Sequence, residues 1–330
     1  MDEIEKYLSE EKYKEAINKC FDINSINLGK LLSYSLPKLN VIRIKLLGFW
    51  TTSDVLREMW NKMSKGNYKW NNIKIVLDEN PDYFVIINSP PNGVFLTDEQ
   101  KKKSIIFHME PYVTSNNYWG EWSNPDVSKF FYVCSHDKEY NNNEWHLSKT
   151  YSELTDMIIK KEEKYDFMLS TVLSDKYCDP GHIKRVDFIK FLDTKEIDVH
   201  VFGSNKFDYK NYKGSLPIYE KDNAIFPYKY VFNVENNSIK NYYTEKLIDG
   251  ILGECLVFYS GCFNVGDFID SRSFIYLELI NFEEDYKKIK NAIENNEWGK
   301  RIDIIRNEKK KILNYLQFFP RLERILSESN

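Results

Sequence analysis

A polar run between two apolar segments holds the side chains best suited to bind a charged ligand. Residues 230–234 read Tyr-Val-Phe-Asn-Val, a pattern typical of a buried strand, and Glu235 and Asn236 follow at its end. A helix is predicted to begin at Thr244, because its hydroxyl can accept a hydrogen bond from the first free N–H groups. The loop between strand and helix therefore places polar side chains where open α/β sheets bind their ligands.

The start of this helix has the properties of a phosphate site. Free backbone N–H groups and the positive end of the helix dipole favour an anion there. Lys246 adds a full positive charge, and Glu245 could accept hydrogen bonds from ribose hydroxyls. A capped helix with a solvated ion pair between Glu245 and Lys246 fits the same spacing equally well, so spacing alone leaves both interpretations open.

The surrounding elements predict a parallel sheet. Apolar residues recur at helical spacing from Leu247 to Leu252, Gly253 can end the helix, and residues 256–259 form a second apolar run. Strand, helix and strand in this order form a βαβ unit, which implies parallel pairing. The same alternation is predicted earlier in the chain, where strands are expected over residues 41–50, 73–77, 83–88, 104–109, 130–134, 167–174 and 197–202.

The polar run resembles the signature of the α-1,3-fucosyltransferases, glycosyltransferase family 10. Members carry a Phe-Glu-Asn-Ser box, then Tyr-x-Thr-Glu-Lys, then an apolar helix and a strand that ends in glycine. Here Glu235 and Asn236 are followed, after five residues, by the run from Tyr242 to Lys246. The resemblance is strongest over residues 165–265 and weaker over residues 41–135.

Three positions depart from the family pattern. Val234 stands where the family usually has phenylalanine, Asn237 where it has serine, and Leu256 where a proline is common. These differences could change the shape of the donor pocket, so the resemblance implies the fold more directly than the identity of the donor sugar.

The resemblance also implies the role of each donor-site residue. Arg185, on a predicted helix, matches the family's diphosphate-binding arginine, and its forked guanidinium suits a phosphate; a surface arginine is the alternative explanation. With Lys246 it would offset the charge of the departing diphosphate, Glu245 would hold the ribose, and two further side chains would orient the fucose and diphosphate. The donor-binding set is Arg185, Glu235, Asn236, Tyr242, Glu245 and Lys246, with Asn236 and Tyr242 as the orienting pair.

Glu110 is the predicted general base. It follows the apolar run 104–109, at the edge of the first predicted sheet. In the family the acidic residue at the end of the corresponding strand is the proposed base, and a partly desolvated carboxylate would have the pKa that a base needs. A solvated loop glutamate is the alternative. Nearby, His108 is predicted to pack within the strand, and three tryptophans could stack on sugar rings or pack within loops: Trp119, Trp122 and Trp145.

The expected architecture is α/β and GT-B-like, with two Rossmann-type domains whose parallel sheets face a central cleft. We expect a helical accessory over residues 1–38, an acceptor-binding domain over 39–160 and a donor-binding domain over 161–300. The last segment, 301–330, is predicted to be a helix that packs back towards the first domain.

Two helix boundaries are predicted in addition. Ser53 is expected to be the N-cap of a helix over residues 53–63. The C-terminal helix is expected to be interrupted near Pro320, since proline cannot continue a helix without losing a hydrogen bond.

Composition excludes several function classes. The 330 residues carry a net charge of −4, without the basic footprint of a nucleic-acid binder. Five widely spaced cysteines form no C-x-x-C pair and the histidines are scattered, so neither a metal site nor a disulfide framework is expected. The N-terminus lacks an apolar signal core, and no apolar run is long enough to span a bilayer. We expect a soluble cytoplasmic protein, as bacterial or viral members of the family can be, in the host cytoplasm if the chain is viral.

The expected function is an inverting, metal-independent transfer of fucose from GDP-fucose to a hydroxyl of a glycan or glycoconjugate. The resemblance implies an acceptor of the N-acetylglucosamine type, an α-1,3 linkage and a role in protein glycosylation. One alternative is a transferase of the same fold with a different nucleotide-sugar donor, which a donor panel would separate. The other is a catalytically silent sugar- or nucleotide-binding protein, which would bind GDP without turnover. The silent protein is disfavoured because the chain has both the predicted base and the predicted diphosphate contacts, Glu110, Arg185, Glu245 and Lys246.

Overall fold

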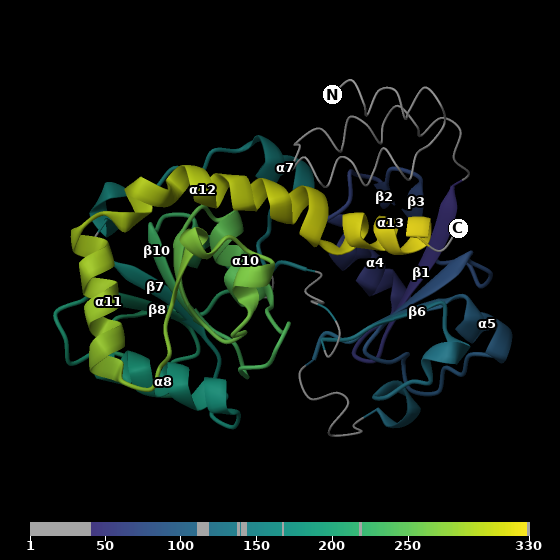
Figure 1. The fold of residues 1–330 in the computed structure, drawn as a ribbon, viewed down its shortest axis with the longest axis horizontal. Coiled ribbons are helices and arrows are strands. Elements are labelled where there is room, and N and C mark those ends of the chain that lie inside the picture. The colour runs from purple at the N-terminus through teal and green to yellow at the C-terminus, as the bar shows by residue number, and fades with distance from the viewer. Residues whose placement is uncertain are drawn as a thin grey trace. The chain divides into compact units, whose positions relative to one another are not determined.

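A computed structural model of the chain describes two compact units. The first unit combines the N-terminal part of the chain through Cys134 with Thr150–Ser152 and Leu313–Asn330, and the second holds Ser135–Lys149 and Glu153–Ile312. Each unit contains one sheet of six strands (Figure 1). The helical accessory predicted for residues 1–38 lies outside the described residues, which are 41–110, 119–136, 139, 144–166, 168–217 and 220–328.

The sheet of the first unit is parallel apart from one edge strand. Its strands lie in the order β2-β3-β1-β4-β5-β6, and β2 pairs antiparallel with β3. Apolar residues of β1, β4 and β5 are buried, as parallel strands covered on both faces require. All five strands predicted in this region are present within a few residues of their expected ends. The strands are β1 (Ile42–Gly48), β2 (Lys69–Trp70), β3 (Ile73–Ile75), β4 (Tyr83–Ile87), β5 (Ser104–Phe107) and β6 (Tyr132–Cys134).

Short helices connect these strands. α4 (Ser53–Asn61) follows β1, and α5 (Asp98–Lys102) precedes β5. The predicted N-cap at Ser53 is wrong, because Thr52 has the extended backbone of a cap and Ser53 is already helical. The sequence could not separate these neighbouring hydroxyl residues, since either side chain is a suitable cap.

The sheet of the second unit is parallel throughout its described strands. Its order is β12-β11-β10-β7-β8-β9, so the chain runs from β7 to one side through β8 and β9 and then crosses to β10 on the other side. The apolar runs predicted at 167–174, 197–202, 230–234 and 256–259 all form strands. The strands are β7 (Leu169–Leu173), β8 (Val199–Gly203), β9 (Tyr212–Gly214), β10 (Tyr230–Val234), β11 (Leu256–Ser260) and β12 (Phe274–Tyr276).

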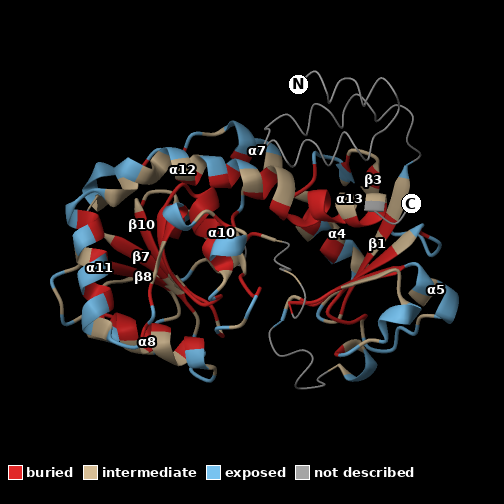
Figure 2. Ribbon diagram, viewed as in Figure 1, coloured by how far each residue is buried: buried red, intermediate tan, exposed pale blue. Residues whose placement is uncertain are grey.

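Helices cover this sheet. Figure 2 shows buried residues concentrated in the strands and on the inner faces of the helices, as a layered α/β domain requires. The helices are α7 (Tyr151–Asp156) at the boundary of the units, α8 (Pro180–Leu192), α9 (Asp222–Ile225), α10 (Glu245–Leu252), α11 (Phe282–Glu294) and α12 (Glu297–Lys311). Short 3₁₀ turns lie at Gly120–Trp122, Val127–Lys129, Glu163–Tyr165, Val265–Asp267 and Ser271–Ser273.

The C-terminal helical segment is interrupted before Pro320 and not at it. α12 is followed by a π-helical stretch, Ile312–Leu316, and then by α13 (Phe318–Glu328), which belongs to the first unit. Pro320 lies in the first turn of α13, where its missing N–H removes no helical hydrogen bond. The expected interruption is therefore present, but proline is compatible with the helix that follows it.

Membrane-spanning helices can be assessed for the part of the chain that the structure describes. None of its helices combines the length and the apolar character that crossing a bilayer requires.

Candidate active site

A pocket of about 290 Å³ lies at the carboxyl ends of β7 and β10. These strands are neighbours at the point where the strand order reverses, which is where open parallel sheets bind their ligands. The starts of α8 and α10 complete the wall. Its polar lining residues are His146, Thr171, Ser174, Lys176, His182, Arg185, Lys221, Asn233, Asn236, Glu245, Lys246 and Asp249.

Gly181 allows α8 to begin directly against the end of β10. Its N–H donates to the main-chain oxygen of Asn236 at 2.9 Å. A Cβ at this position would lie 1.8 Å from the main-chain oxygen of Glu235, so a larger residue would push the helix away. The glycine thus places Arg185, one turn further along α8, in the pocket wall.

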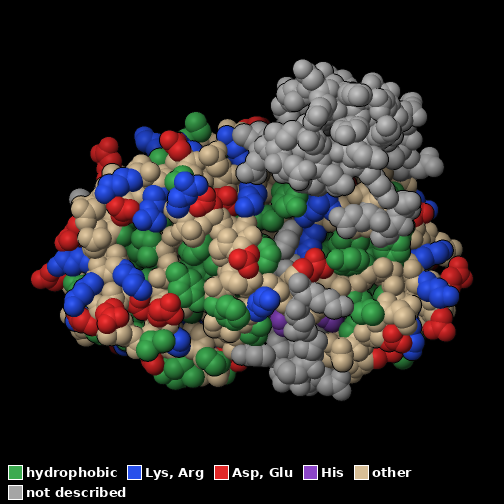
Figure 3. Space-filling model, in the orientation of Figure 1, with side chains coloured by type: hydrophobic (Ala, Val, Ile, Leu, Met, Phe, Trp, Pro, Cys, Tyr) green, Lys and Arg blue, Asp and Glu red, His purple; other side chains and the backbone are tan. Residues whose placement is uncertain are grey.

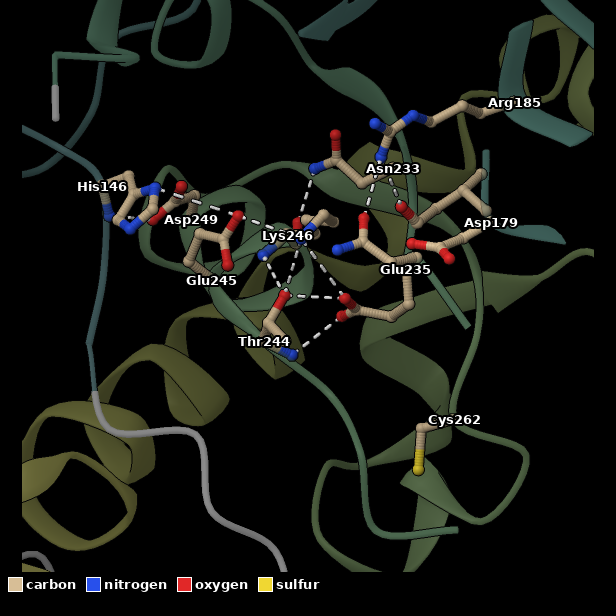
Figure 4. A network of polar contacts seen from close by, with 12 residues as sticks. His146, Asp179, Arg185, Asn233, Glu235, Thr244, Glu245, Lys246, Asp249 and Cys262 are labelled. Carbon is tan, nitrogen blue, oxygen red and sulfur yellow. Dashed lines mark hydrogen bonds and ion pairs between the residues drawn. The ribbon is translucent and has the colours of Figure 1, made fainter. Parts of the chain in front are cut away.

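Glu235 supports the start of α10 from below the pocket. Its carboxylate is fully buried and accepts hydrogen bonds from Thr244, from N–H at 2.8 Å and from Oγ1 at 2.7 Å (Figure 4). Thr244 Oγ1 accepts in turn from the N–H of Lys246, which confirms the predicted N-cap. Burial raises the pKa of Glu235, while the ammonium of Lys246 opposes that change. Glu235 does not line the pocket, so its contacts are those of a support for the binding helix.

Glu245 and Lys246 both lie in the pocket wall. Lys246 Nζ is 3.2 Å from Thr244 Oγ1, 3.2 Å from Glu245 Oε1 and 3.6 Å from Glu235 Oε2. Burial would raise the pKa of Glu245, but Lys246 and Lys221 outweigh it and hold that pKa well below its ordinary value. Glu245 is therefore ionised at neutral pH and offers acceptors to a ligand.

Arg185 is a buried cation on the same wall, 5% exposed. Its Nη2 donates to Ser174 Oγ at 2.8 Å, and Nη1 donates to Val234 O and Asn236 Oδ1, both at 3.4 Å. Nε has no hydrogen-bond partner, and no carboxylate of the described residues forms an ion pair with the guanidinium. Burial lowers the pKa of Arg185. The ordinary pKa of an arginine is so high that the guanidinium nevertheless stays charged at neutral pH. A buried charge of this kind favours an anionic ligand.

The two remaining donor-site candidates differ in position. Asn236 lines the pocket next to Arg185. Tyr242 is buried and outside the pocket lining, with its ring centroid 6.1 Å from that of His136. Of the six predicted donor residues, four therefore line one pocket, and Glu235 and Tyr242 are buried outside its lining.

Sequence reasoning missed five charged or titratable residues of the pocket, His146, Lys176, His182, Lys221 and Asp249. Lys221 Nζ lies 3.0 Å from Asp249 Oδ2 and 3.4 Å from Glu245 Oε1. The N–H of His146 donates to Asp249 Oδ1 at 2.7 Å, and His146 Nδ1 lies 3.8 Å from Glu245 Oε1 (Figure 4). Asp249 follows Glu245 by one helical turn, so its place could have been inferred from spacing. Nothing in the local sequence marks Lys221 or His146.

A second polar cluster stands at the start of α8. Cys178, Asp179 and His182 each place one potential metal-binding atom within 4.8 Å of the others. The Nδ1 atom of His182, however, accepts from the N–H of Asp179 at 3.3 Å, which is a helix-capping contact. Burial and the nearby charge of Arg185 lower the pKa of His182 to about 4. The same positive charge opposes a bound cation, so the cluster fits a helix start better than a metal site.

Glu110 belongs to the first unit and follows β5 after two residues. Its side chain is exposed, in contrast to the partial desolvation expected of a base. Its main-chain N–H and that of Met109 both donate to Asn88 Oδ1, at 3.2 and 2.7 Å. Asn88 follows β4 and has the left-handed φ of +62°, so its side chain fixes the backbone that carries Glu110. The role of Glu110 as base stays a prediction.

The remaining aromatic candidates pack within their own units. His108 is buried and its Nε2 lies 2.8 Å from the main-chain oxygen of Trp122, as predicted for a strand histidine. Trp145 is fully buried and donates from Nε1 to the main-chain oxygen of Lys149, so it cannot stack on a sugar in this arrangement. Trp119 and Trp122 contact the rings of Phe49 and Phe130.

Solved structures with a similar fold include glycosyltransferases of the GT-B class, which confirms the expected fold class. An α1,3-fucosyltransferase superposes with a TM-score of 0.50 at 17% identity, covering 88% of this chain and 89% of that one. An α-glucosyltransferase, solved with UDP and a 13-mer DNA containing a central A:G mismatch, gives 0.52 at 12% identity, covering 87% and 100%. At these identities the likeness is one of fold. A comparison with curated proteins gave no significant match.

The family comparison concerns the part of the chain that carries the pocket. Residues 159–318 match the model of the family described as glycosyltransferase family 10 (fucosyltransferase), C-terminal part. The matched residues contain Arg185, Lys221, Glu245 and Lys246, all of which line the pocket. This region, just under half of the chain, is thus similar to the C-terminal part of glycosyltransferase family 10, the fucosyltransferases.

Proposed function

We propose that this chain transfers fucose from GDP-fucose to a hydroxyl of a glycan or glycoconjugate. The observation that carries the proposal is Arg185, a buried guanidinium in the pocket wall with an unpartnered Nε and no carboxylate paired to it among the described residues. A pocket that holds such a cation beside a helix N-terminus suits a diphosphate.

The charge arrangement also suits departure of the diphosphate. Negative charge grows on the leaving GDP as the sugar–phosphate bond breaks. Arg185, Lys246 and the positive end of the α10 dipole are in place before the reaction and would stabilise that charge. Glu245, ionised in the same wall, would accept hydrogen bonds from ribose hydroxyls.

The acceptor chemistry is proposed from the family resemblance. Glu110 removes a proton from an acceptor hydroxyl, and that oxygen attacks the anomeric carbon from the face opposite GDP, so the configuration inverts to an α-fucoside. An acceptor of the N-acetylglucosamine type and an α-1,3 linkage complete the proposal. Neither step requires a metal ion, because protein cations offset the diphosphate charge.

A different donor is the second candidate, and one observation favours it. Val234, which stands where the family usually has phenylalanine, lies in the pocket wall. A smaller side chain there leaves room for a different sugar or base. Asn237, the other departure in the box, is buried and outside the pocket lining, so it gives no reason to change the donor.

A thermal-shift titration of the whole chain tests the donor. GDP, GDP-fucose, GDP-mannose, UDP-galactose and UDP-N-acetylglucosamine are compared, since a ligand that binds the folded state raises Tm by an amount that grows with the logarithm of its concentration over Kd. Shifts with GDP and GDP-fucose alone are expected. A preference for a UDP-sugar would contradict the fucose donor and support the second candidate, and GDP binding without transfer to any glycan would favour a silent binding protein.

A further inference from the structure

Two ammonium groups share one carboxylate oxygen in the pocket. Lys246 Nζ and Lys221 Nζ lie 3.2 and 3.4 Å from the same atom, Glu245 Oε1. Lys246 is the lysine proposed to contact the diphosphate, yet here its charge is shared with Glu245 and with Glu235. To bind a phosphate oxygen, Lys246 must loosen its hold on Glu245, and that carboxylate then needs another cation.

Lys221 is placed to be that cation. It joins Glu245 to Asp249, which lies one turn further along α10 and is 1% exposed. Two carboxylates at this spacing repel each other unless a cation lies between them. Burial would lower the pKa of Lys221, but Asp249 and Glu245 outweigh it and raise that pKa above its ordinary value. Lys221 therefore stays charged and neutralises both neighbours.

The position of Lys221 is fixed by its backbone as well. Its N–H donates to the main-chain oxygen of His146 at 3.1 Å. The next residue, Asp222, accepts from Ser148 through N–H at 2.8 Å and Oγ at 3.0 Å. Because these contacts involve no ligand, Lys221 is held between Glu245 and Asp249 before any donor arrives.

We propose that Lys221 is a positioning residue of the donor site, which holds Glu245 and Asp249 in place so that Lys246 is free to bind the diphosphate. The inference rests on the proposed function, because it assumes that the pocket takes a nucleotide diphosphate. Without Lys221, Glu245 would draw Lys246 more strongly, and the two would form a closed ion pair that competes with the phosphate.

Calorimetric titration of the full-length chain with GDP tests the proposal. Lys221→Met is expected to weaken GDP binding about tenfold, a usual size for a residue that acts through a contact residue. Lys221→Arg keeps the cation and should restore most of the affinity. Lys210→Met removes an exposed lysine of the same unit and should leave binding unchanged. If methionine lowers Tm, Lys221→Gln, which keeps a donor but no charge, is measured in its place.

A double-mutant cycle separates positioning from general support of the fold. In a chain that already carries Lys246→Met, replacing Lys221 should cost about twofold or less, because the effect passes through Lys246. An equal loss of GDP affinity in both backgrounds, or unchanged GDP affinity in Lys221→Met, would overturn this inference and leave the donor proposal standing. A wild-type chain that binds no GDP would overturn the donor proposal and this inference together.

Discussion

At the scale of single residues, Glu110 and the pocket cations have separate tasks. Glu110→Gln removes the proposed base while keeping size and hydrogen bonding. Transfer to acceptor should fall on the order of 100-fold or more in kcat, because general-base catalysis contributes at least that much. GDP affinity should stay as in the wild type. Initial-rate kinetics and GDP titration measure both quantities, with Glu99→Gln on α5 as an exposed control in the same unit. Near-normal transfer by a folded Glu110→Gln chain would show that another group is the base.

Asn88 gives a second test of Glu110. Asn88→Gly tolerates the φ of +62° but removes the side-chain oxygen that accepts from the N–H groups of Met109 and Glu110. The freed backbone should misplace Glu110, so kcat should fall about tenfold with KM for the donor unchanged. Initial-rate kinetics of Asn88→Gly, Glu110→Gln and the double variant test whether Asn88 acts through Glu110. Additive losses would mean that Asn88 acts independently of Glu110.

At the scale of elements, the binding wall depends on how closely α8 approaches β10. Gly181→Ala would place a Cβ 1.8 Å from the main-chain oxygen of Glu235 and displace the helix that carries Arg185. We expect a loss of about 3 kcal/mol in the free energy of unfolding, typical of overpacking, and weaker GDP binding. Denaturant unfolding and GDP titration are the measurements. Gly266→Ala, where nothing lies within 4 Å of the added carbon, is the matched control and should change neither quantity.

Local patterns predicted the elements of the site better than its contacts. The strand at 230–234, the cap at Thr244 and the helix after it follow from short-range periodicity, and the structure has all three. Lys221 and His146 escaped prediction because their place depends on contacts with Asp249, which lies 28 and 103 residues away in the chain. For the same reason the sequence could not distinguish Asn236, in the pocket wall, from Glu235, directly beneath it.

At the scale of the whole molecule, charge is distributed without a dominant sign. Figure 3 shows Lys and Arg side chains interspersed with Asp and Glu over α11 and α12, consistent with a net charge of −4. Stability should therefore depend on particular buried pairs more than on overall charge repulsion.

Metal removal tests the whole catalytic arrangement. Because Arg185, Lys246 and the start of α10 offset the diphosphate charge, activity should survive an excess of EDTA. Transfer assays with and without chelator check this, with heat-treated chain as the blank. Loss of activity on chelation and its return on adding Mg²⁺ or Mn²⁺ would contradict a metal-independent mechanism.

The acid sensitivity of stability should depend on Glu254, which ties the turn after α10 to α12 within the second unit. Its Oε1 lies 2.9 Å from Lys309 Nζ and its Oε2 lies 2.9 Å from Arg306 Nε. Burial would raise the pKa of Glu254, but the hydrogen bond and charge of Lys309 outweigh it and lower that pKa below 4.5. The carboxylate of Glu254 therefore binds a proton more readily in the unfolded state than in the folded state. The stabilisation that it provides is complete above about pH 4.5, and it is lost as the pH falls through the pKa of Glu254 in the folded state.

Glu254→Gln should therefore lower the free energy of unfolding at pH 7 by about 3 kcal/mol, since Lys309 loses its buried partner. The variant should also lose less stability than the wild type between pH 5 and pH 3. Denaturant titrations across that range measure both effects, and Glu196→Gln, on an exposed carboxylate, is the control. Equal acid sensitivity of wild type and Glu254→Gln would assign the acid response to other carboxylates.

The return of α13 to the first unit has a consequence for biosynthesis. Trp60 and Phe107 both pack on Phe318, and Trp70 stacks on Phe319. A ribosome makes the strands of the first unit before most of the second unit, but it makes these phenylalanines only after Ile312. The second unit, which ends at Ile312, can be completed before then. The unit whose strands are made first is thus the last to complete its core, because that core includes side chains made after the second unit.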